Sequence, residues 1–283
     1  MLKVLQAGFY SSIQDMGRFD FQEFGVPISG VMDSYAAKLA NTILGNQPNH
    51  AVLEITLSGP KLEFLNDTLI CITGADLSPQ INNRDIPHNI ALGLQEGDIL
   101  NFNSLEYGCR CYLAVLGGFQ TEMVMNSRSM YKNITNSFKI QKEAILPFKL
   151  ITDFSKKSTH ASIKVKASHF QNNEIEVYTG PEFDLLTHDE QQLLLNSEFT
   201  VAPENSRMAY QLKETISNNL SPIITSLVLP GTVQLTPSGK LILLMRDCQT
   251  TGGYPRVFQL SEEGINTLAQ KFTNDKIQFK LLS

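Results

Sequence analysis

The chain has 283 residues, of which 42% are hydrophobic and 18% charged, a composition typical of a globular protein with one large or two medium domains. Its 23 basic and 28 acidic residues give a formal charge of −5, so neither nucleic acid nor an anionic membrane is expected as a partner. No apolar run reaches the roughly 18 residues of a membrane span, and "MLKVLQAGFYSS" lacks the apolar core of a signal peptide, so we expect a cytoplasmic protein.

The first half of the chain predicts one helix followed by short strands. In "MDSYAAKLANTILGN", Asp33 can cap the helix and Gly45 can end it. Its apolar face is formed by Ala36, Leu39, Ala40, Ile43 and Leu44. Segments rich in β-branched and aromatic residues then predict strands at 51–57, 61–65, 69–73, 98–103 and 109–117.

The second half begins after a polar stretch, 153–173, which we interpret as a linker with a possible edge strand at 162–167. Strands are predicted at 174–180, 207–212, 232–235 and 240–246, and helices at 187–196 and 261–272. A capping box of Thr187 and Glu190 opens the first of these helices, and Ser261 caps the second. The prediction is a mainly β protein of two lobes, residues 1–160 and 161–283.

The four cysteines, Cys71, Cys109, Cys111 and Cys248, contain no CxxC pair and are expected to be free thiols in a reducing compartment. The five histidines are scattered along the chain, so no metal site is predicted.

One stretch, "RDCQTTGGYPRVFQL" (246–260), concentrates polar and permissive residues directly after the apolar run 241–245. A Gly-Gly pair after a strand is more typical of a tight turn than of a ligand site, so the residues alone favour a structural role.

Several motifs in order change this interpretation: "QDMGR" (14–18), "GVPISG" (25–30), "LEITLSGP" (53–60), "TGADL" (73–77), "YLAVLGG" (112–118), "GPEFD" (180–184) and "TTGGYPR" (250–256). Together they resemble the biotin-dependent carboxyltransferase family, which includes the C subunit of 5-oxoprolinase, KipA and part of the carboxyltransferase domain of urea amidolyase. The resemblance extends from about Gln14 to Gln259. The chain departs from the family pattern at 126–130, where "NSRSM" replaces GSRST. It also departs in the glycine-free segment 131–148 and in lacking a tryptophan near residue 88.

The resemblance implies two cyclophilin-like β-barrels. It also implies the C subunit of an ATP-dependent 5-oxoprolinase, which opens 5-oxo-L-proline to L-glutamate together with a KipI-like protein (the B subunit) and a LamB/YcsF-like protein (the A subunit). The alternatives are a carboxyltransferase that uses biotin carried by another chain, and a non-catalytic KipA-like antagonist of a KipI-like kinase inhibitor. This chain has neither a biotin acceptor motif nor a Walker motif, so no biotin is expected on it and ATP is assigned to the complex.

The substrates of these enzymes share a carbonyl flanked by nitrogen, on whose oxygen negative charge develops. N–H donors and guanidinium groups stabilise such charge. We therefore predict catalytic roles for Arg256, Gln249 and Asp247. We predict substrate binding by Thr250, Thr251, Gly252, Gly253, Tyr254, Arg207, Arg18 and Arg128.

Structural alternatives exist for several of these residues. Arg18 could form a turn ion pair with Asp15, Asp76 could satisfy turn amides, and Tyr254 could pack. Arg128 and Arg207 could be solvated. The turn at Gly252 and Gly253 is expected to need a positive φ at Gly253.

Overall fold

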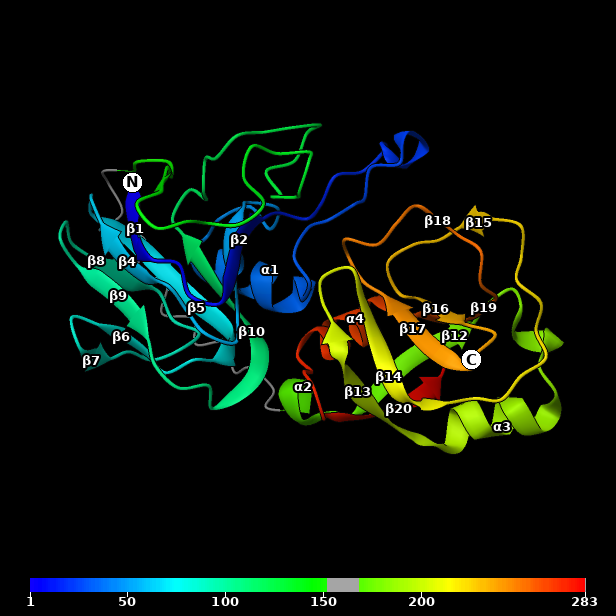
Figure 1. Cartoon of the computed structure of the whole chain (residues 1–283). Coiled ribbons are helices and arrows are strands. Elements are labelled where there is room, and N and C mark those ends of the chain that lie inside the picture. The colour runs from blue at the N-terminus through cyan, green and yellow to red at the C-terminus, as the bar shows by residue number, and fades with distance from the viewer. Residues whose placement is uncertain (152–167, 283) are drawn as a thin grey trace. The chain divides into compact units, whose positions relative to one another are not determined.

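A computed structural model describes residues 1–151 and 168–282 and divides the chain into two compact units (Figure 1). Unit 1 comprises Met1–Arg18 and Ser29–Phe170, and unit 2 comprises Phe19–Ile28 and Gln171–Ser283. The predicted edge strand at 162–167 and most of the predicted linker lie outside the described residues. The division at residue 160 therefore stays a prediction.

Unit 1 contains two sheets, with strand orders β11-β1-β4-β9-β6-β7 and β2-β3-β10-β5-β8. The strands of the first sheet are β1 (Leu2–Gln6), β4 (Lys61–Phe64), β6 (Pro79–Ile81), β7 (Arg84–Asp85), β9 (Ile99–Phe102) and β11 (Ile145–Leu146). The strands of the second are β2 (Tyr10–Gln14), β3 (Val52–Thr56), β5 (Thr68–Asp76), β8 (Leu92–Leu94) and β10 (Tyr107–Val115). The pairings within both sheets are antiparallel.

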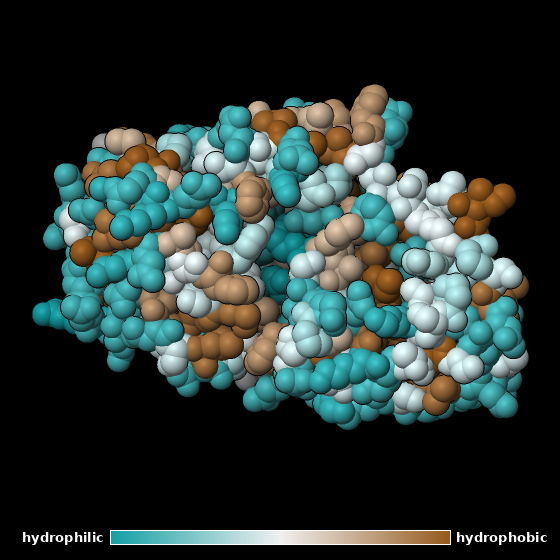
Figure 2. Space-filling model, viewed as in Figure 1, coloured by the Kyte–Doolittle hydropathy of each residue, from teal (hydrophilic) through white to brown (hydrophobic). Residues whose placement is uncertain are grey.

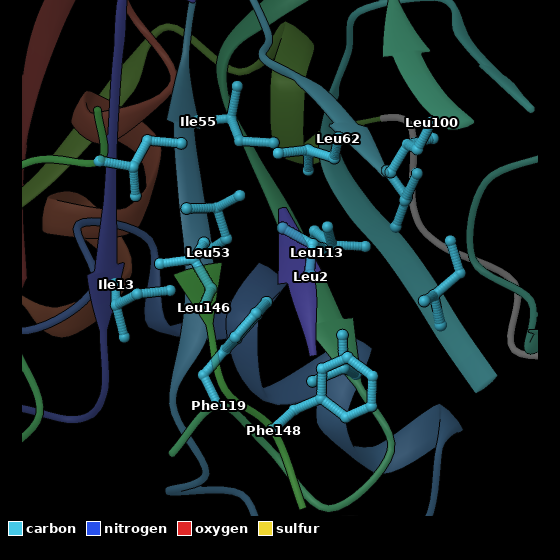
Figure 3. Close-up of a cluster of buried hydrophobic side chains, with 14 of the residues drawn as sticks. Leu2, Ile13, Leu53, Ile55, Leu62, Leu100, Leu113, Phe119, Leu146 and Phe148 are labelled. Atoms are coloured by element: carbon cyan, nitrogen blue, oxygen red, sulfur yellow. The ribbon is translucent and has the colours of Figure 1, made fainter. Parts of the chain in front are cut away.

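The main core of unit 1 is built from both sheets, because side chains alternate between the two faces of each strand. On β10, Cys111, Leu113 and Val115 join this core with Leu2, Leu62 and other apolar residues (Figure 3). The intervening Tyr112 and Ala114 face a second cluster, which includes Ala37 and Ala40 of helix α1 (Ser34–Ile43). β10 is therefore buried on both faces, which explains its long apolar run.

Helix α1 begins where the sequence predicted, because the Asp33 carboxylate accepts a hydrogen bond from the Ala36 N–H at 3.0 Å. The other carboxylate oxygen of Asp33 lies 2.9 Å from Nε2 of His169, in α2 (Ser168–Gln171). The Asp33 N–H donates to the Tyr112 hydroxyl, which in turn donates to Glu54. These buried polar contacts fix the start of the helix in unit 1.

Unit 2 contains a closed barrel of order β12-β19-β16-β17-β14-β13-β20. Its strands are β12 (Glu174–Thr179), β13 (Glu198–Asn205), β14 (Ala209–Thr215), β16 (Thr232–Leu235), β17 (Lys240–Leu244), β19 (Arg256–Leu260) and β20 (Lys276–Leu281). β20 closes the barrel by pairing parallel with β12 and antiparallel with β13. The mainly β class is confirmed. The closed barrel lies in unit 2, whereas the strands of unit 1 form two sheets.

Three aromatic side chains connect the barrel core: the ring centroids of Phe258 and Phe279 are 5.1 Å apart, and those of Phe199 and Phe279 are 5.4 Å apart. The strands of the barrel are connected by η2 (Phe183–Leu185), α3 (His188–Asn196), α4 (Glu262–Ala269) and the ribbon of β15 (Ser226–Leu227) with β18 (Thr251–Gly252). One further short element, η1 (Gln22–Phe24), lies between β2 and α1. The capping box that opens α3 and the Ser261 cap of α4 are both confirmed.

The four cysteines are free, as predicted, and all four are buried. On the face drawn in Figure 2, hydrophobic side chains reach the surface in small separate groups among polar ones. Within residues 1–151 and 168–282, no helix has both the length and the apolar character needed to cross a membrane.

Candidate functional site

The polar stretch identified in the sequence connects β17 to β19 of the barrel in unit 2. Its middle, Thr251–Gly252, is the strand β18, which pairs with β15. Two further backbone bonds extend this ribbon: the Val228 N–H donates to the Thr250 carbonyl at 3.1 Å, and the Ile223 N–H to the Gly253 carbonyl at 3.0 Å. The segment is thus supported by the loop that precedes β16.

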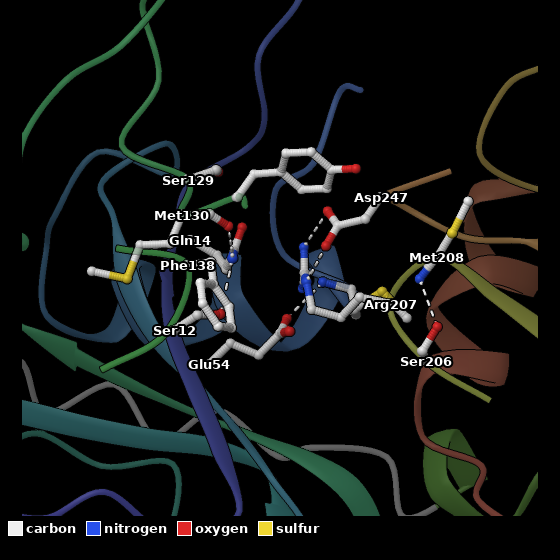
Figure 4. A network of polar contacts seen from close by, with 12 residues as sticks. Ser12, Gln14, Glu54, Ser129, Met130, Phe138, Ser206, Arg207, Met208 and Asp247 are labelled. Carbon is white, nitrogen blue, oxygen red and sulfur yellow. Dashed lines mark hydrogen bonds and ion pairs between the residues drawn. The ribbon is translucent and has the colours of Figure 1, made fainter. Parts of the chain in front are cut away.

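Asp247 at the start of the segment is held by Arg207 in a two-pronged ion pair (Figure 4). Nε and Nη2 of Arg207 donate to the two carboxylate oxygens at 2.8 and 3.0 Å, and the Asp247 N–H donates to the Arg207 carbonyl. The two residues are only 8% and 6% exposed. The structure therefore brings together a predicted catalytic residue and a predicted substrate-binding one.

Arg256 at the end of the segment is held in the same way by Glu182, with Nε and Nη2 donating to its two carboxylate oxygens at 2.9 and 2.8 Å. Nη1 donates to the Ser226 hydroxyl at 2.6 Å and to the Leu227 carbonyl at 3.1 Å. The hydrogen bond from Arg256 holds the pKa of Glu182 below its ordinary value, although burial opposes this shift. Two bidentate ion pairs thus fix both ends of the segment.

Glu182 was not singled out from the sequence, although it lies in the quoted motif "GPEFD". Its partner is 74 residues away along the chain, so nothing local marked the pairing. The only indication was indirect: Glu182 lies in a family motif, and an acidic residue in one motif can form an ion pair with an arginine in another.

The expectation of a positive φ at Gly253 is wrong, because neither Gly252 nor Gly253 lies in the left-handed region. Position 252 requires a glycine, but for a different reason. A Cβ at Gly252 would lie 2.4 Å from Nε2 of Gln234, which is itself buried, whereas for a Cβ at Gly253 the nearest atom of the described residues is the Ile223 carbonyl oxygen at 3.4 Å. Close approach of a neighbouring side chain, not backbone twist, explains this glycine.

The middle of the segment carries the polar side chains of Gln249, Thr250 and Thr251. Within the described part of the chain, the side chains of Gln249, Thr250 and Thr251 make no hydrogen bond. Thr251 is exposed, and Gln249 and Thr250 are half-buried. Tyr254 is 39% exposed, while its carbonyl accepts from Gln234. These groups are free to contact a ligand.

Cys248 lies within the segment but is not a nucleophile at neutral pH. Burial, and secondarily the charge of Asp247, raise the pKa of its thiol to about 12.

The predicted residues Arg18 and Arg128 belong to unit 1. Arg18 is fully buried, and its guanidinium donates to the carbonyls of Val124 and Ser129 at 3.1 and 2.9 Å. Asp15 accepts hydrogen bonds from the hydroxyls of Ser127 and Ser129, at 2.6 and 2.7 Å. The motifs "QDMGR" and "NSRS" therefore meet and fix the loop before residue 130.

Two further residues of these motifs have defined partners. The Arg128 main-chain N–H donates to Asp15 at 2.6 Å, and its Nη2 donates to Gln120 at 2.8 Å. The amide of buried Gln14 donates to the Ser12 hydroxyl and the Met130 carbonyl (Figure 4).

Asp76 of "TGADL" accepts from the Ser78 N–H at 2.8 Å, so the interpretation that it satisfies a turn amide is confirmed. The same oxygen lies 3.1 Å from Nε2 of His88. Burial lowers the pKa of His88 despite the opposing charge of Asp76, so this imidazole is neutral at pH 7.

The family model described as the carboxyltransferase domain, subdomain A and B, matches residues 24–281. The chain therefore belongs to this carboxyltransferase-domain family, which confirms the resemblance seen in the motifs.

Individual relatives agree. The protein named as the C subunit of 5-oxoprolinase in Escherichia coli (strain K12) is 31% identical over 287 residues, which cover 99% of this chain and 90% of that protein. The protein of the same name from Haemophilus influenzae is 27% identical over 298 residues, which cover 100% of this chain and 92% of that protein. Among solved structures, the K. lactis urea amidolyase matches with a TM-score of 0.88 at 26% identity. That match covers all of this chain but 19% of the urea amidolyase chain.

Proposed function

We propose that the chain is the C subunit of a cytoplasmic 5-oxoprolinase complex that uses ATP to hydrolyse 5-oxo-L-proline to L-glutamate. Similarity over nearly the full length to two proteins that bear this subunit's name supports the proposal. The proposal includes a KipI-like protein and a LamB/YcsF-like protein as partners, because the relatives' name implies a multi-subunit enzyme. ATP is assigned to the complex and not to a particular subunit.

A single observation carries the site assignment: on a segment fixed at both ends, the side chains of Gln249, Thr250 and Thr251 make no hydrogen bond to residues 1–151 or 168–282. Opening a lactam places negative charge on its carbonyl oxygen. Hydroxyl and amide donors that are already held in place stabilise that charge without reorganising. In this proposal these three groups contact the lactam, and Gly252, Gly253 and Tyr254 complete the ligand-facing surface.

The two ion pairs have a supporting role in the same proposal. Nε, Nη1 and Nη2 of Arg256 all have protein partners, so we assign this residue to positioning of the segment. Asp247 likewise uses both carboxylate oxygens to hold Arg207.

The test replaces the unpartnered groups and leaves the ion pairs intact. In the assembled complex, Thr250→Val and Thr251→Val together should lower turnover about a hundredfold, the typical effect of removing a donor to a developing oxyanion. The melting temperature should stay near that of the wild type, because these two side chains form no hydrogen bond with the residues that the structure describes. Thr215→Val, an exposed threonine at the end of β14, is the matched control. Normal turnover in the double variant would refute the site.

A second candidate function, transfer of a carboxyl group from biotin carried on another chain, is favoured by the match to the K. lactis urea amidolyase. The two functions differ in the substrate and in the partner proteins that the chain requires. Formation of glutamate from 5-oxoproline in the presence of the KipI-like and LamB/YcsF-like partners supports the first. Carboxylation of urea in the presence of a carboxylated biotin carrier, without turnover of 5-oxoproline, would replace it with the second.

A further inference from the structure

The turn at Gly117 and Gly118 in unit 1 brings together three segments that are distant in sequence. Directly after this turn, the Phe119 N–H donates to the Ala51 carbonyl at 3.1 Å. The Lys149 N–H donates to the Gly118 carbonyl at 3.3 Å. The residues next to position 50, the turn itself and the residues next to position 149 therefore lie side by side.

The two glycines allow two basic side chains to approach this turn closely. Both have positive φ, 81° at Gly117 and 74° at Gly118. A Cβ at Gly117 would lie 2.8 Å from Cβ of Lys149, and one at Gly118 would lie 2.8 Å from Cβ and 3.0 Å from Cγ of His50. The lysine stem and the histidine ring thus occupy the space beside the bare backbone, which explains "LGG" in the sequence.

Arg128 is tied to the same turn through a glutamine. Nη2 of Arg128 donates to Oε1 of Gln120 at 2.8 Å, and Nε2 of Gln120 donates to the Gly117 carbonyl at 3.2 Å. Nη1 of Arg128 donates to the Thr121 carbonyl. The guanidinium is therefore held in one orientation, and Nε has no hydrogen-bond partner within residues 1–151 and 168–282.

Among the described residues, no carboxylate forms an ion pair with His50, Arg128 or Lys149. Asp15 contacts Arg128 through the main-chain N–H. Nδ1 of His50 is buried and has no hydrogen-bond partner in the described part of the chain. Burial, and then the charges of Lys149 and Arg128, lower the pKa of His50.

We propose that His50, Arg128 and Lys149 form a binding site for an oxyanion of the phosphate class. With His50 neutral, Arg128 and Lys149 supply two positive charges, which match a phosphate dianion. The guanidinium offers directed N–H donors to oxygen and the ammonium a point charge, while the imidazole of His50 lies close enough to both charges to sense a bound anion. The anion could be free phosphate or the phosphoryl group of a nucleotide. The site lies in unit 1, whereas the Gln249–Thr251 segment belongs to unit 2.

The test follows the imidazole signal of His50 by NMR as a function of pH, with the signal assigned from a His50→Gln variant. Sulfate is the first probe, because its charge stays constant across the titration, and sodium chloride of equal ionic strength is the reference. We expect sulfate to raise the midpoint of His50 and leave the other four histidines unchanged. Equal midpoints in sulfate and chloride would overturn the proposal.

Two variants that each remove one lysine charge distinguish a specific binding site from nonspecific electrostatic attraction. Lys149→Gln should raise the midpoint of His50 without anion and weaken phosphate binding about tenfold, as expected for loss of one charge-assisted contact. Lys142→Gln, which removes an exposed lysine from the same region, should change neither quantity. If the two variants behave alike, the site is refuted.

Inorganic phosphate and ATP, compared in the wild-type chain at neutral pH, distinguish the two sources of the anion. Tighter binding of ATP than of phosphate, lost in Lys149→Gln, identifies a nucleotide phosphoryl group. The reverse order identifies free phosphate.

Discussion

Arg256 has a definite set of contacts, and its removal should affect activity more than stability. Because the ion pair with Glu182 is partly exposed, its contribution to stability should be about 1 kcal/mol. Arg256→Ala should leave the melting temperature within a few degrees of the wild type. It should nevertheless lower turnover of the assembled complex, because it releases one end of the segment that carries Gln249–Thr251.

Arg256→Lys provides the comparison for that prediction. A lysine cannot reproduce the two-pronged contact with Glu182, so turnover should be rescued little. Full activity in Arg256→Lys would show that the charge alone is sufficient. Melting curves and glutamate formation, measured on Arg256→Ala and Arg256→Lys, show whether the bidentate contact or the charge alone is needed.

The glycine pair gives a second prediction at the scale of single residues. Gly252→Ala should destabilise unit 2, because the new methyl group would lie 2.4 Å from the amide of buried Gln234. Gly253→Ala should be tolerated, since its nearest neighbour would be 3.4 Å away. Thermal unfolding of the two variants measures the difference, and equal melting temperatures would contradict it.

Single residues also show what the sequence could and could not reveal. The helix caps at Asp33, Thr187 and Ser261 were predictable, because each depends on residues within three positions. The ion pair between Glu182 and Arg256 was not, because it depends on how β19 lies in the barrel. The sequence analysis predicted a catalytic role for Arg256, which stays a prediction, and could not deduce its partner.

At the scale of elements, strand β10 illustrates how much a hydrophobic pattern predicts. The sequence predicted a strand at 109–117, and the structure has a strand there that is buried on both faces. The short strands β6, β7 and β11 were not predicted, since two or three residues carry too little periodicity. The sequence likewise did not show that unit 1 would form two sheets.

The burial of β10 predicts a large effect of truncation. Leu113→Ala should lower the free energy of unfolding by about 2–5 kcal/mol, because Leu113 is fully buried in the core between the sheets. Leu193→Ala in α3, where the side chain is 47% exposed, is the matched control and should cost much less. Chemical denaturation measures both, and similar losses would contradict the packing described.

The ion pair that fixes the start of β19 also predicts an acid dependence. The pKa of Glu182 in the folded chain is lower than its ordinary 4.5, so the pair stabilises the fold fully above that pH. This contribution is lost as the pH falls through the folded pKa. The difference in unfolding free energy between wild type and Glu182→Gln should therefore be largest near neutral pH and shrink below pH 4.5. A difference in unfolding free energy that increases as the pH falls would contradict this prediction.

At the scale of the whole molecule, the family assignment carries most of the functional argument, and it was available from the ordered motifs. The proposed complex makes a direct prediction. The isolated chain should have no measurable 5-oxoprolinase activity, because it lacks a Walker motif and a clear general base. Activity should appear when the KipI-like and LamB/YcsF-like partners and ATP are added. Turnover by the isolated chain, measured as glutamate release, would refute this requirement.

The closing strand of the barrel has a consequence for how unit 2 is made. β20 fills the space between β12 and β13, so until Lys276–Leu281 has been synthesised those two strands each keep one unpaired edge. Exposed edges invite pairing with another chain, and the contacts that remove them span about 100 residues of sequence. Nascent chains stalled before residue 276 should therefore be more prone to aggregation than completed ones, and the final residues of the barrel act as protection against misassembly as well as part of its wall.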